Sequence, residues 1–283
     1  MGEMGFDGIV VTDALDMGGF KGWYLTHEQA EIESFKAGCD MMLWPSKNYA
    51  DNLERAILSG EVPMERLDDA VTRILRVKER RGLFDPNREV FRDLSEEEKR
   101  FVREFQVRCS DQAMTLVRDR LCRFPLSAEK TPKLAIFVVG EHRTALQDAS
   151  VLKEEFEKRG FLVEYNEDGK IPSDELDRVY RENDLVLWAT FSRAYRPIGF
   201  IDYTADRAMR IRSAFKPDYA VGKALAVSFG SPYFGDQYFE KAQTYVNAYS
   251  MLAESVRSFV RAACGEIEFM GKSPVRLNVN DQK

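Results

Sequence analysis

The sequence predicts an α/β protein built around a mostly parallel β-sheet. Short apolar, β-branched runs alternate with amphipathic segments of about ten residues or more, which is the pattern of βαβ units. The chain has 283 residues, of which 44% are hydrophobic and 12% aromatic. This is enough apolar material for one large domain or two ordinary ones, and it argues against disorder of the whole chain.

The first part of the chain alternates two strands with three helices. Residues 8–12 predict a buried parallel strand, because they are apolar and β-branched. A capping-box pattern opens a helix at 26–38, and residues 39–44 form a second apolar run. One amphipathic helix then ends at Gly60, and another covers 63–82 with proline first. Two βα units cannot close a barrel, so by spacing alone this region resembles the tail of a larger α/β domain.

Residues 83–133 are expected to be a linker with connecting helices. The stretch 83–93 has no periodicity and carries turn residues. Ser95 with Glu98 is a second capping box, and the helical pattern that it opens runs towards Val117.

A new α/β region is expected in residues 134–283. Its apolar runs and amphipathic periods alternate to the end of the chain. The predicted strands are 134–140, 161–165, 184–191, 224–229 and 244–249, and the predicted helices are 146–160, 173–182, 205–215 and 251–264. This alternation favours a parallel sheet covered on both faces.

Charge and composition exclude several classes of function. The chain carries 41 basic and 47 acidic residues, a net charge of −6, which is opposite to that of most nucleic-acid-binding proteins. No apolar stretch is long enough to span a membrane, and Met1–Met4 lack the features of an export signal. The four cysteines form no C-x-x-C pair and there are two histidines, so we expect no metal site and no cofactor.

One segment resembles a known catalytic motif. The residues from Gly5 to Met17 read GFDGIVVTDALDM and are similar to the nucleophile segment of family 3 glycoside hydrolases, in which an aspartate after Ser or Thr ends a barrel strand. Three further segments resemble that family in the expected order: AGCDMML at 37–43, the helix at 67–84, and 226–267 with its AVSFGSPY start.

The resemblance implies a fold and two site residues. Residues 1–82 would be the incomplete tail of a (β/α)8 barrel, and 134–283 an open, mostly parallel, flavodoxin-like α/β sandwich. Asp13 would be the catalytic nucleophile and Met17 would line the sugar pocket. The tail Ala14-Leu15-Asp16-Met17 favours the β-N-acetylglucosaminidase branch over the β-glucosidase branch. The alternatives are that Asp13 caps a turn, that Asp16 caps a helix and that Met17 is core.

The resemblance also exposes what this chain lacks. The N-acetylglucosaminidase branch takes its acid/base from a His–Asp pair in an earlier loop, and no such segment is present. The glucosidase branch uses a glutamate of its C-terminal domain, and no glutamate here has a matching context. His27 is expected to be a surface helix residue, and His142 to lie in a plain strand-to-helix turn.

The sequence therefore predicts part of a retaining glycosidase that acts on β-linked N-acetylglucosamine, with a carbohydrate as its partner and no turnover by this chain alone. A β-glucosidase-type enzyme and a non-catalytic glycan-binding or docking module are the alternatives. A second chain, or a second copy, could complete the barrel by pairing with the free strand edges.

Overall fold

The computed structural model describes the chain except for residues 1–4, 90, 141–146, 168–172, 193–221 and 278–283. The described residues form two compact units, which divide between Asp93 and Leu94. The expected helix at 205–215 and the turn with His142 lie outside the described residues, so the structure does not test them.

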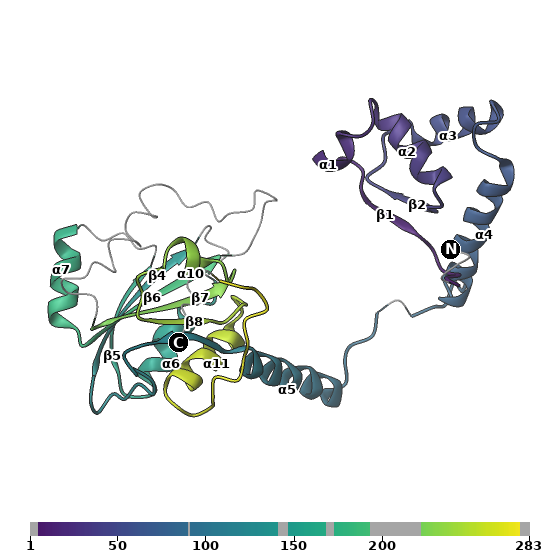
Figure 1. Cartoon of the computed structure of the whole chain (residues 1–283). Helices are drawn as coiled ribbons and strands as arrows, with labels where there is room; N and C mark the ends of the chain where they lie inside the picture. The colour runs from purple at the N-terminus through teal and green to yellow at the C-terminus, as the bar shows by residue number, and fades with distance from the viewer. Residues whose placement is uncertain (1–4, 90, 141–146, 168–172, 193–221, 278–283) are drawn as a thin grey trace. The chain divides into compact units, whose positions relative to one another are not determined.

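The first unit is a two-stranded parallel sheet with helices packed on it (Figure 1). Its elements are β1 (Val11–Ala14), α1 (Gly18–Lys21), α2 (His27–Lys36), β2 (Met41–Leu43), α3 (Tyr49–Leu58) and α4 (Met64–Arg80). Thr26 caps α2 as expected, because its hydroxyl accepts a hydrogen bond from the Gln29 N–H at 3.1 Å. Gly38, at φ +110°, follows the helix in a conformation that favours glycine.

A small core holds the first unit together. It consists of Ile32, Phe35, Ala56, Val62 and Ala70, with Met42, Leu53, Ile57 and Leu67 packed against it. The strand expected at 8–12 is found at Val11–Ala14, and the expectation that it is buried is wrong. One face of β1 and β2 packs on the helices, while Val11, Met41 and Leu43 on the other face are exposed, because no second layer covers that face in the described unit.

The second unit contains a six-stranded sheet. Its elements are α5 (Glu96–Ala113), β3 (Thr115–Asp119), β4 (Lys133–Gly140), α6 (Val151–Glu157), β5 (Leu162–Glu167), α7 (Ser173–Glu182), β6 (Leu185–Ser192), β7 (Ala224–Gly230), α10 (Phe234–Gln237), β8 (Thr244–Asn247) and α11 (Ala253–Ala263). The strand order is β3-β8-β7-β6-β4-β5, with β3 antiparallel and the other pairs parallel.

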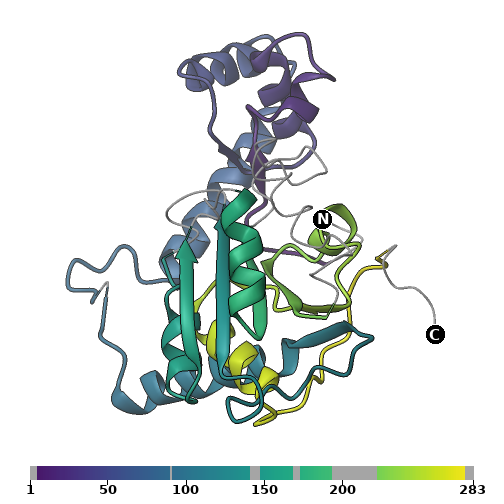
Figure 2. The same ribbon diagram turned by 90° about the vertical axis from the view of Figure 1, so that its left-hand side faces the viewer.

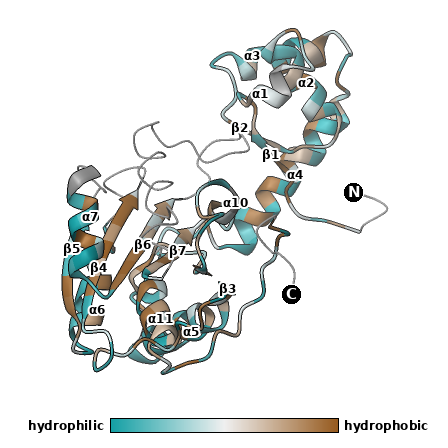
Figure 3. Ribbon diagram, turned by 60° about the vertical axis from the view of Figure 1, so that its left-hand side comes forward, coloured by the Kyte–Doolittle hydropathy of each residue, from teal (hydrophilic) through white to brown (hydrophobic). Residues whose placement is uncertain are grey.

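The five parallel strands of this sheet confirm the mixed α/β class. In chain order from β4 they lie as 2-1-3-4-5, which is the flavodoxin-like order of a doubly wound sheet. One core cluster packs α6 and α11 on one face, and another packs α7 and α10 on the opposite face (Figures 1 and 2). The strands are accordingly apolar along their length, while α7 shows a hydrophilic outer side (Figure 3).

The stretch 94–133 differs from the expected linker. The helix that was predicted to run towards Val117 ends at Ala113, and Met114 turns into extended backbone at φ −60° and ψ 114°. Thr115–Asp119 then pairs with β8 as an edge strand, which the β-branched Thr115 and Val117 suit. These residues therefore belong to the second unit, and the described residues between α4 and α5 form no helix or strand.

Candidate functional site

Asp13 lies in an irregular stretch of β1. Val11 pairs with Met41 and Ala14 pairs with Leu43, so three steps along β1 match two along β2. This extra residue is a β-bulge, a feature that bends a strand and redirects side chains and that is common at barrel rims and beside active sites. The bulge therefore determines how the Asp13 carboxylate is presented.

Two hydrogen bonds define the local geometry of the bulge. The Leu43 N–H, which would otherwise donate to the strand ladder, donates to the Thr12 hydroxyl at 2.9 Å. The Asp13 Oδ1 accepts from the N–H of Ala14 at 2.7 Å. The Asp13 side chain is exposed, and this hydrogen bond engages one of its two oxygens. A carboxylate so placed is available as a nucleophile or as a hydrogen-bond acceptor for a ligand.

Met17 lies four residues further on, across a tight turn. The Met17 N–H donates to the Ala14 carbonyl at 3.2 Å, and the Met17 side chain is 50% exposed. The alternative that Met17 is part of the core is therefore wrong for the described unit, whereas its role in sugar binding is not tested. Asp16, in the same turn, is also exposed.

An ion pair that sequence reasoning missed holds the two strands in register. The buried Asp40 carboxylate accepts from the Val10 N–H and from Arg66 Nη2, both at 2.9 Å. The same guanidinium donates to the carbonyls of Phe35 and Cys39. The AGCD motif quoted above contains Asp40, but the pairing of Asp40 with Arg66 in α4 depends on tertiary contacts.

A second buried carboxylate holds the loop after β2. Glu31, in α2, accepts hydrogen bonds from both the N–H and the hydroxyl of Ser46. His27 lies 3.7 Å from the Glu31 carboxylate and is half-buried, so its expected position on the helix surface is only partly right. Burial raises the pKa of Tyr49 to about 12, and the negative charge of Glu31 adds to this effect.

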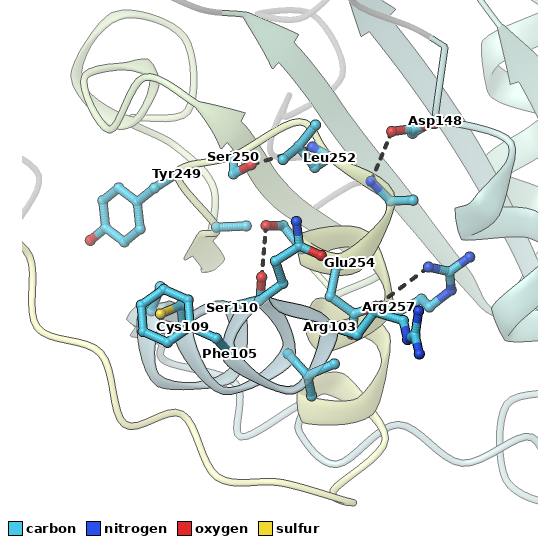
Figure 4. Close-up of a pocket in the computed structure, with 16 residues that line it drawn as sticks. Arg103, Phe105, Cys109, Ser110, Asp148, Tyr249, Ser250, Leu252, Glu254 and Arg257 are labelled. Carbon is cyan, nitrogen blue, oxygen red and sulfur yellow. Dashed lines mark hydrogen bonds and ion pairs between the residues drawn. The ribbon is translucent and has the colours of Figure 1, made fainter. Parts of the chain in front are cut away.

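The second unit contains a hollow of its own. A cavity of about 730 Å³ lies between α5 and the segment that joins β8 to α11, beyond the carboxyl end of β8 (Figure 4). Its wall includes Phe105, Tyr249 and Leu252, and Asp148 accepts a hydrogen bond from the Ala253 N–H at its edge. The volume is in the range of small-ligand sites, and ligands of doubly wound sheets bind at this end of the strands.

Within the described ranges, no cluster of three or more His, Cys, Asp or Glu side chains could hold a metal ion. No helix among the same residues is long and apolar enough to cross a membrane.

Comparison with known proteins relates the first unit to one family of enzymes. Residues 2–77 match the family described as "Glycosyl hydrolase family 3 N terminal domain". A Beta-N-acetylglucosaminidase/beta-glucosidase from Cellulomonas fimi is 40% identical over 84 residues, covering 29% of this chain and 14% of that protein. A Beta-xylosidase from Formosa agariphila is 29% identical over 150 residues, covering 50% of this chain and 21% of that protein.

Solved structures show the same likeness over most of the chain. The Beta-glucoside phosphorylase BglX is 25% identical with a TM-score of 0.75, over 98% of this chain and 50% of that one. The chain thus spans half or less of the length of these relatives. The likeness to family 3 glycosidases that the motifs suggested is confirmed. The names of these relatives refer to different sugars, namely xylose, glucose and N-acetylglucosamine.

Proposed function

We propose that this chain carries the nucleophile of a retaining glycosidase, with Asp13 attacking the anomeric carbon of a β-linked sugar. The observation that carries the proposal is the exposed carboxylate in the bulge of β1, inside the segment that matches the glycosidase family. Retaining enzymes need a carboxylate that forms a glycosyl-enzyme, and a second group about 5 Å away that protonates the leaving oxygen. The finer proposal is that the sugar is N-acetylglucosamine, as the Ala14–Met17 tail favours.

In this mechanism Asp13 forms a bond to the anomeric carbon while the bond to the leaving oxygen breaks. Water then hydrolyses the glycosyl ester and restores the carboxylate. The first step needs a proton for an alkoxide leaving group, and general acid catalysis typically contributes about 10²–10⁴-fold. We therefore expect no measurable turnover of ordinary aryl N-acetylglucosaminides by the 283-residue chain.

An activated fluorosugar tests the nucleophile without the missing acid. A dinitrophenyl leaving group needs no proton, and a ring fluorine slows hydrolysis of the ester, so the covalent intermediate accumulates. We expect a 2-fluoro glucoside or a 5-fluoro N-acetylglucosaminide of this kind to add the mass of one sugar to the peptide that contains Asp13. The sugar that reacts faster then distinguishes the β-glucosidase branch from the β-N-acetylglucosaminidase branch.

The matched variants are Asp13→Asn, which should take up no label, and Asp16→Asn, which should label normally. Labelling of Asp16, or of neither residue, would contradict the assignment of the nucleophile. Robust turnover of an unactivated substrate that disappears in Asp13→Asn would show that this chain also supplies an acid.

A second candidate function is glycan binding by the second unit without catalysis. It is favoured by the cavity at the carboxyl end of β8. A shortened chain that starts near Ser95 distinguishes the two proposals. If it folds and binds glycan as tightly as the whole chain, the binding function resides in the second unit and Asp13 is not needed for it.

A further inference from the structure

Trp44 lies directly beyond β2, next to the strand that carries Asp13. Leu43, the residue before it, pairs with Ala14 and accepts a hydrogen bond from the Leu15 N–H at 3.2 Å. Neighbouring strands lie about 5 Å apart, so the distance from Trp44 to Asp13 is one that a mono- or disaccharide can span.

The backbone of Trp44 has an unusual conformation for a bulky residue. Its φ is +53°, in the left-handed region that non-glycine residues rarely adopt. Strand alternation would place Trp44 on the same side as Met42, which packs on the core of the first unit. The turn at positive φ, followed by Pro45, ends that alternation, and the indole is left 65% exposed.

The chain holds this loop with a buried charge. Two residues after Trp44, the N–H and hydroxyl of Ser46 both donate to the Glu31 carboxylate, whose side chain has no exposed surface. Burial of a carboxylate is unfavourable unless hydrogen bonds compensate for the lost water, so both oxygens of Glu31 are used to fix the loop. Backbone strain together with such an anchor is typical of segments positioned for binding.

We propose that Trp44 is an aromatic platform on which the apolar C–H face of a pyranose ring lies, in a sugar subsite beside Asp13. This inference rests on the proposed function, whose substrate is a β-linked sugar. The C–H groups of such a ring form an apolar patch, which packs on an aromatic face, while the hydroxyls reach polar groups around the ring's edge. The subsite would contribute to affinity and not to the chemical step.

The three tryptophans of the chain provide a matched comparison. Trp23, in the same unit, is 87% exposed, while Trp188 is buried in the second unit. In the unaltered chain, N-bromosuccinimide oxidises exposed indoles, and peptide mass spectrometry reads each one separately. We expect saturating N-acetylglucosamine, or its β-1,4-linked dimer, to protect Trp44 and to leave Trp23 as reactive as before. Equal reactivity of Trp44 with and without sugar would overturn the proposal.

Variants test the same subsite by affinity, with binding followed by saturation-transfer NMR and folding by circular dichroism. Trp44→Ala should weaken sugar binding about three- to tenfold, the range expected for loss of one aromatic contact. Trp44→Phe should restore part of the affinity, and Trp23→Ala should bind as the parent chain does. Unchanged binding by Trp44→Ala, or an equal loss in Trp23→Ala, would contradict the platform.

The fluorosugar separates this inference from the proposed function. Trp44→Ala should raise the concentration of fluorosugar that half-saturates labelling of Asp13, and leave the limiting rate within about twofold, because the platform binds and does not react. If Asp13 is never labelled but sugar still protects Trp44, the nucleophile proposal fails and the subsite stands. If Asp13 is labelled with the same half-saturation in both chains, the subsite fails and the nucleophile stands.

Discussion

Single side chains decide how the candidate nucleophile is presented. The Thr12 hydroxyl replaces a backbone carbonyl as the acceptor for the Leu43 N–H, and this substitution accommodates the extra residue of β1. The Asp40 carboxylate fixes the start of the same strand through the Val10 N–H. Asp13 therefore lies in a bulge that two polar side chains hold in place. Asp40, just before β2, binds the backbone of Val10 ahead of the bulge, and Thr12, within the bulge, binds the backbone of Leu43 in β2.

The bulge makes a testable prediction about Thr12. Thr12→Val keeps the shape of the side chain but removes the acceptor, so the Leu43 N–H loses its partner. We expect a loss of about 1 kcal/mol in the free energy of unfolding, measured with urea, and slower fluorosugar labelling of Asp13. Thr12→Ser keeps the hydroxyl and should behave nearly as the parent chain. If both variants label at the parental rate, Thr12 does not position Asp13.

At the scale of elements, helix α5 is unusual because it carries a strong cap but has no buried residue. The Ser95 hydroxyl accepts from the Glu98 N–H, and the Glu98 carboxylate accepts from the Ser95 N–H at 2.8 Å. Near its other end α5 is tied to α11, where Asp111 accepts from Ser258 and Arg261. The first turns of α5 therefore depend on local interactions, and the last turns on tertiary ones.

This division predicts a local effect of the cap. Ser95→Ala should cost about 1 kcal/mol of helix stability, but the loss should appear as faster hydrogen exchange in the first turn of α5, with little change in the urea midpoint of the second unit. Ser150→Ala is the control, because Ser150 occupies the N-cap position of α6 without a side-chain cap bond. If Ser95→Ala instead lowered the free energy of unfolding of the whole second unit by about 1 kcal/mol, local fraying of α5 would be contradicted.

A second element-scale link joins α6 to the segment after α11. Arg159 donates to Glu155 at 2.8 Å and to Glu266 through a second pair of contacts. Its hydrogen bonds lower the pKa of Glu266. Burial acts to raise the pKa of Glu155, but hydrogen bonds from Lys158 and Arg159 outweigh it and the pKa of Glu155 is also lowered.

The lowered pKa values predict how stability depends on pH. A carboxylate with a folded-state pKa below its unfolded value contributes stability that is complete above the unfolded pKa, about 4.5, and is lost as the pH falls through the folded value. The urea midpoint of the second unit should therefore drop between pH 5 and pH 3. Arg159→Gln should make that drop shallower, and should cost only about 1 kcal/mol at pH 7, because Glu266 is 45% exposed.

The control for this titration is Arg103→Gln. Arg103 is exposed on α5 and has no ion pair among the described residues, so its replacement should leave the pH profile unchanged. An Arg159→Gln profile that parallels the parent's would show that other groups cause the acid sensitivity.

At the scale of the whole molecule, the two units differ in how much core each has. The second unit buries its sheet between two extended clusters, whereas the first relies on one small cluster under two strands and leaves an apolar strand face exposed. A small core gives marginal stability, and an uncovered strand face with free edges invites pairing with another chain. We propose that a second chain or copy completes this layer, and a strictly monomeric state at high protein concentration would contradict that proposal.

Unequal cores predict two unfolding transitions. In urea, amides of α2, α3 and α4 should lose protection from hydrogen exchange at a lower concentration than amides of β4, β6 and β7, and the fluorescence of buried Trp188 should report only the later transition. Trp188→Phe is the control: it should remove the later fluorescence change, leave the signal of Trp23 and Trp44 in the first unit, and keep both exchange transitions. One coincident transition for all these elements would contradict independent units.

Much of the fold could be predicted because its signals are local. The caps at Thr26 and Ser95, the strand near 134–140 and the helix Ser173–Glu182 are specified by residues within one or two turns of each other. The position of Asp13 could also be predicted, because the apolar run that precedes it is adjacent in the sequence. Strand β3 was missed because its partner β8 lies more than 100 residues away, and a β-branched run after a helix can also continue that helix.

The sequence by itself determined the α/β class and the order of most elements, and its resemblance to a known motif singled out Asp13 as the proposed nucleophile. Only the tertiary structure decided that β1 bulges at Asp13, that Asp40 meets Arg66, and that Trp44 leaves its strand at a positive φ with Glu31 anchoring the loop behind it. The physical reason is the distance along the chain over which each kind of interaction acts. Periodicity and capping act between near neighbours along the chain, whereas a bulge and a buried ion pair exist only once distant segments have been packed together.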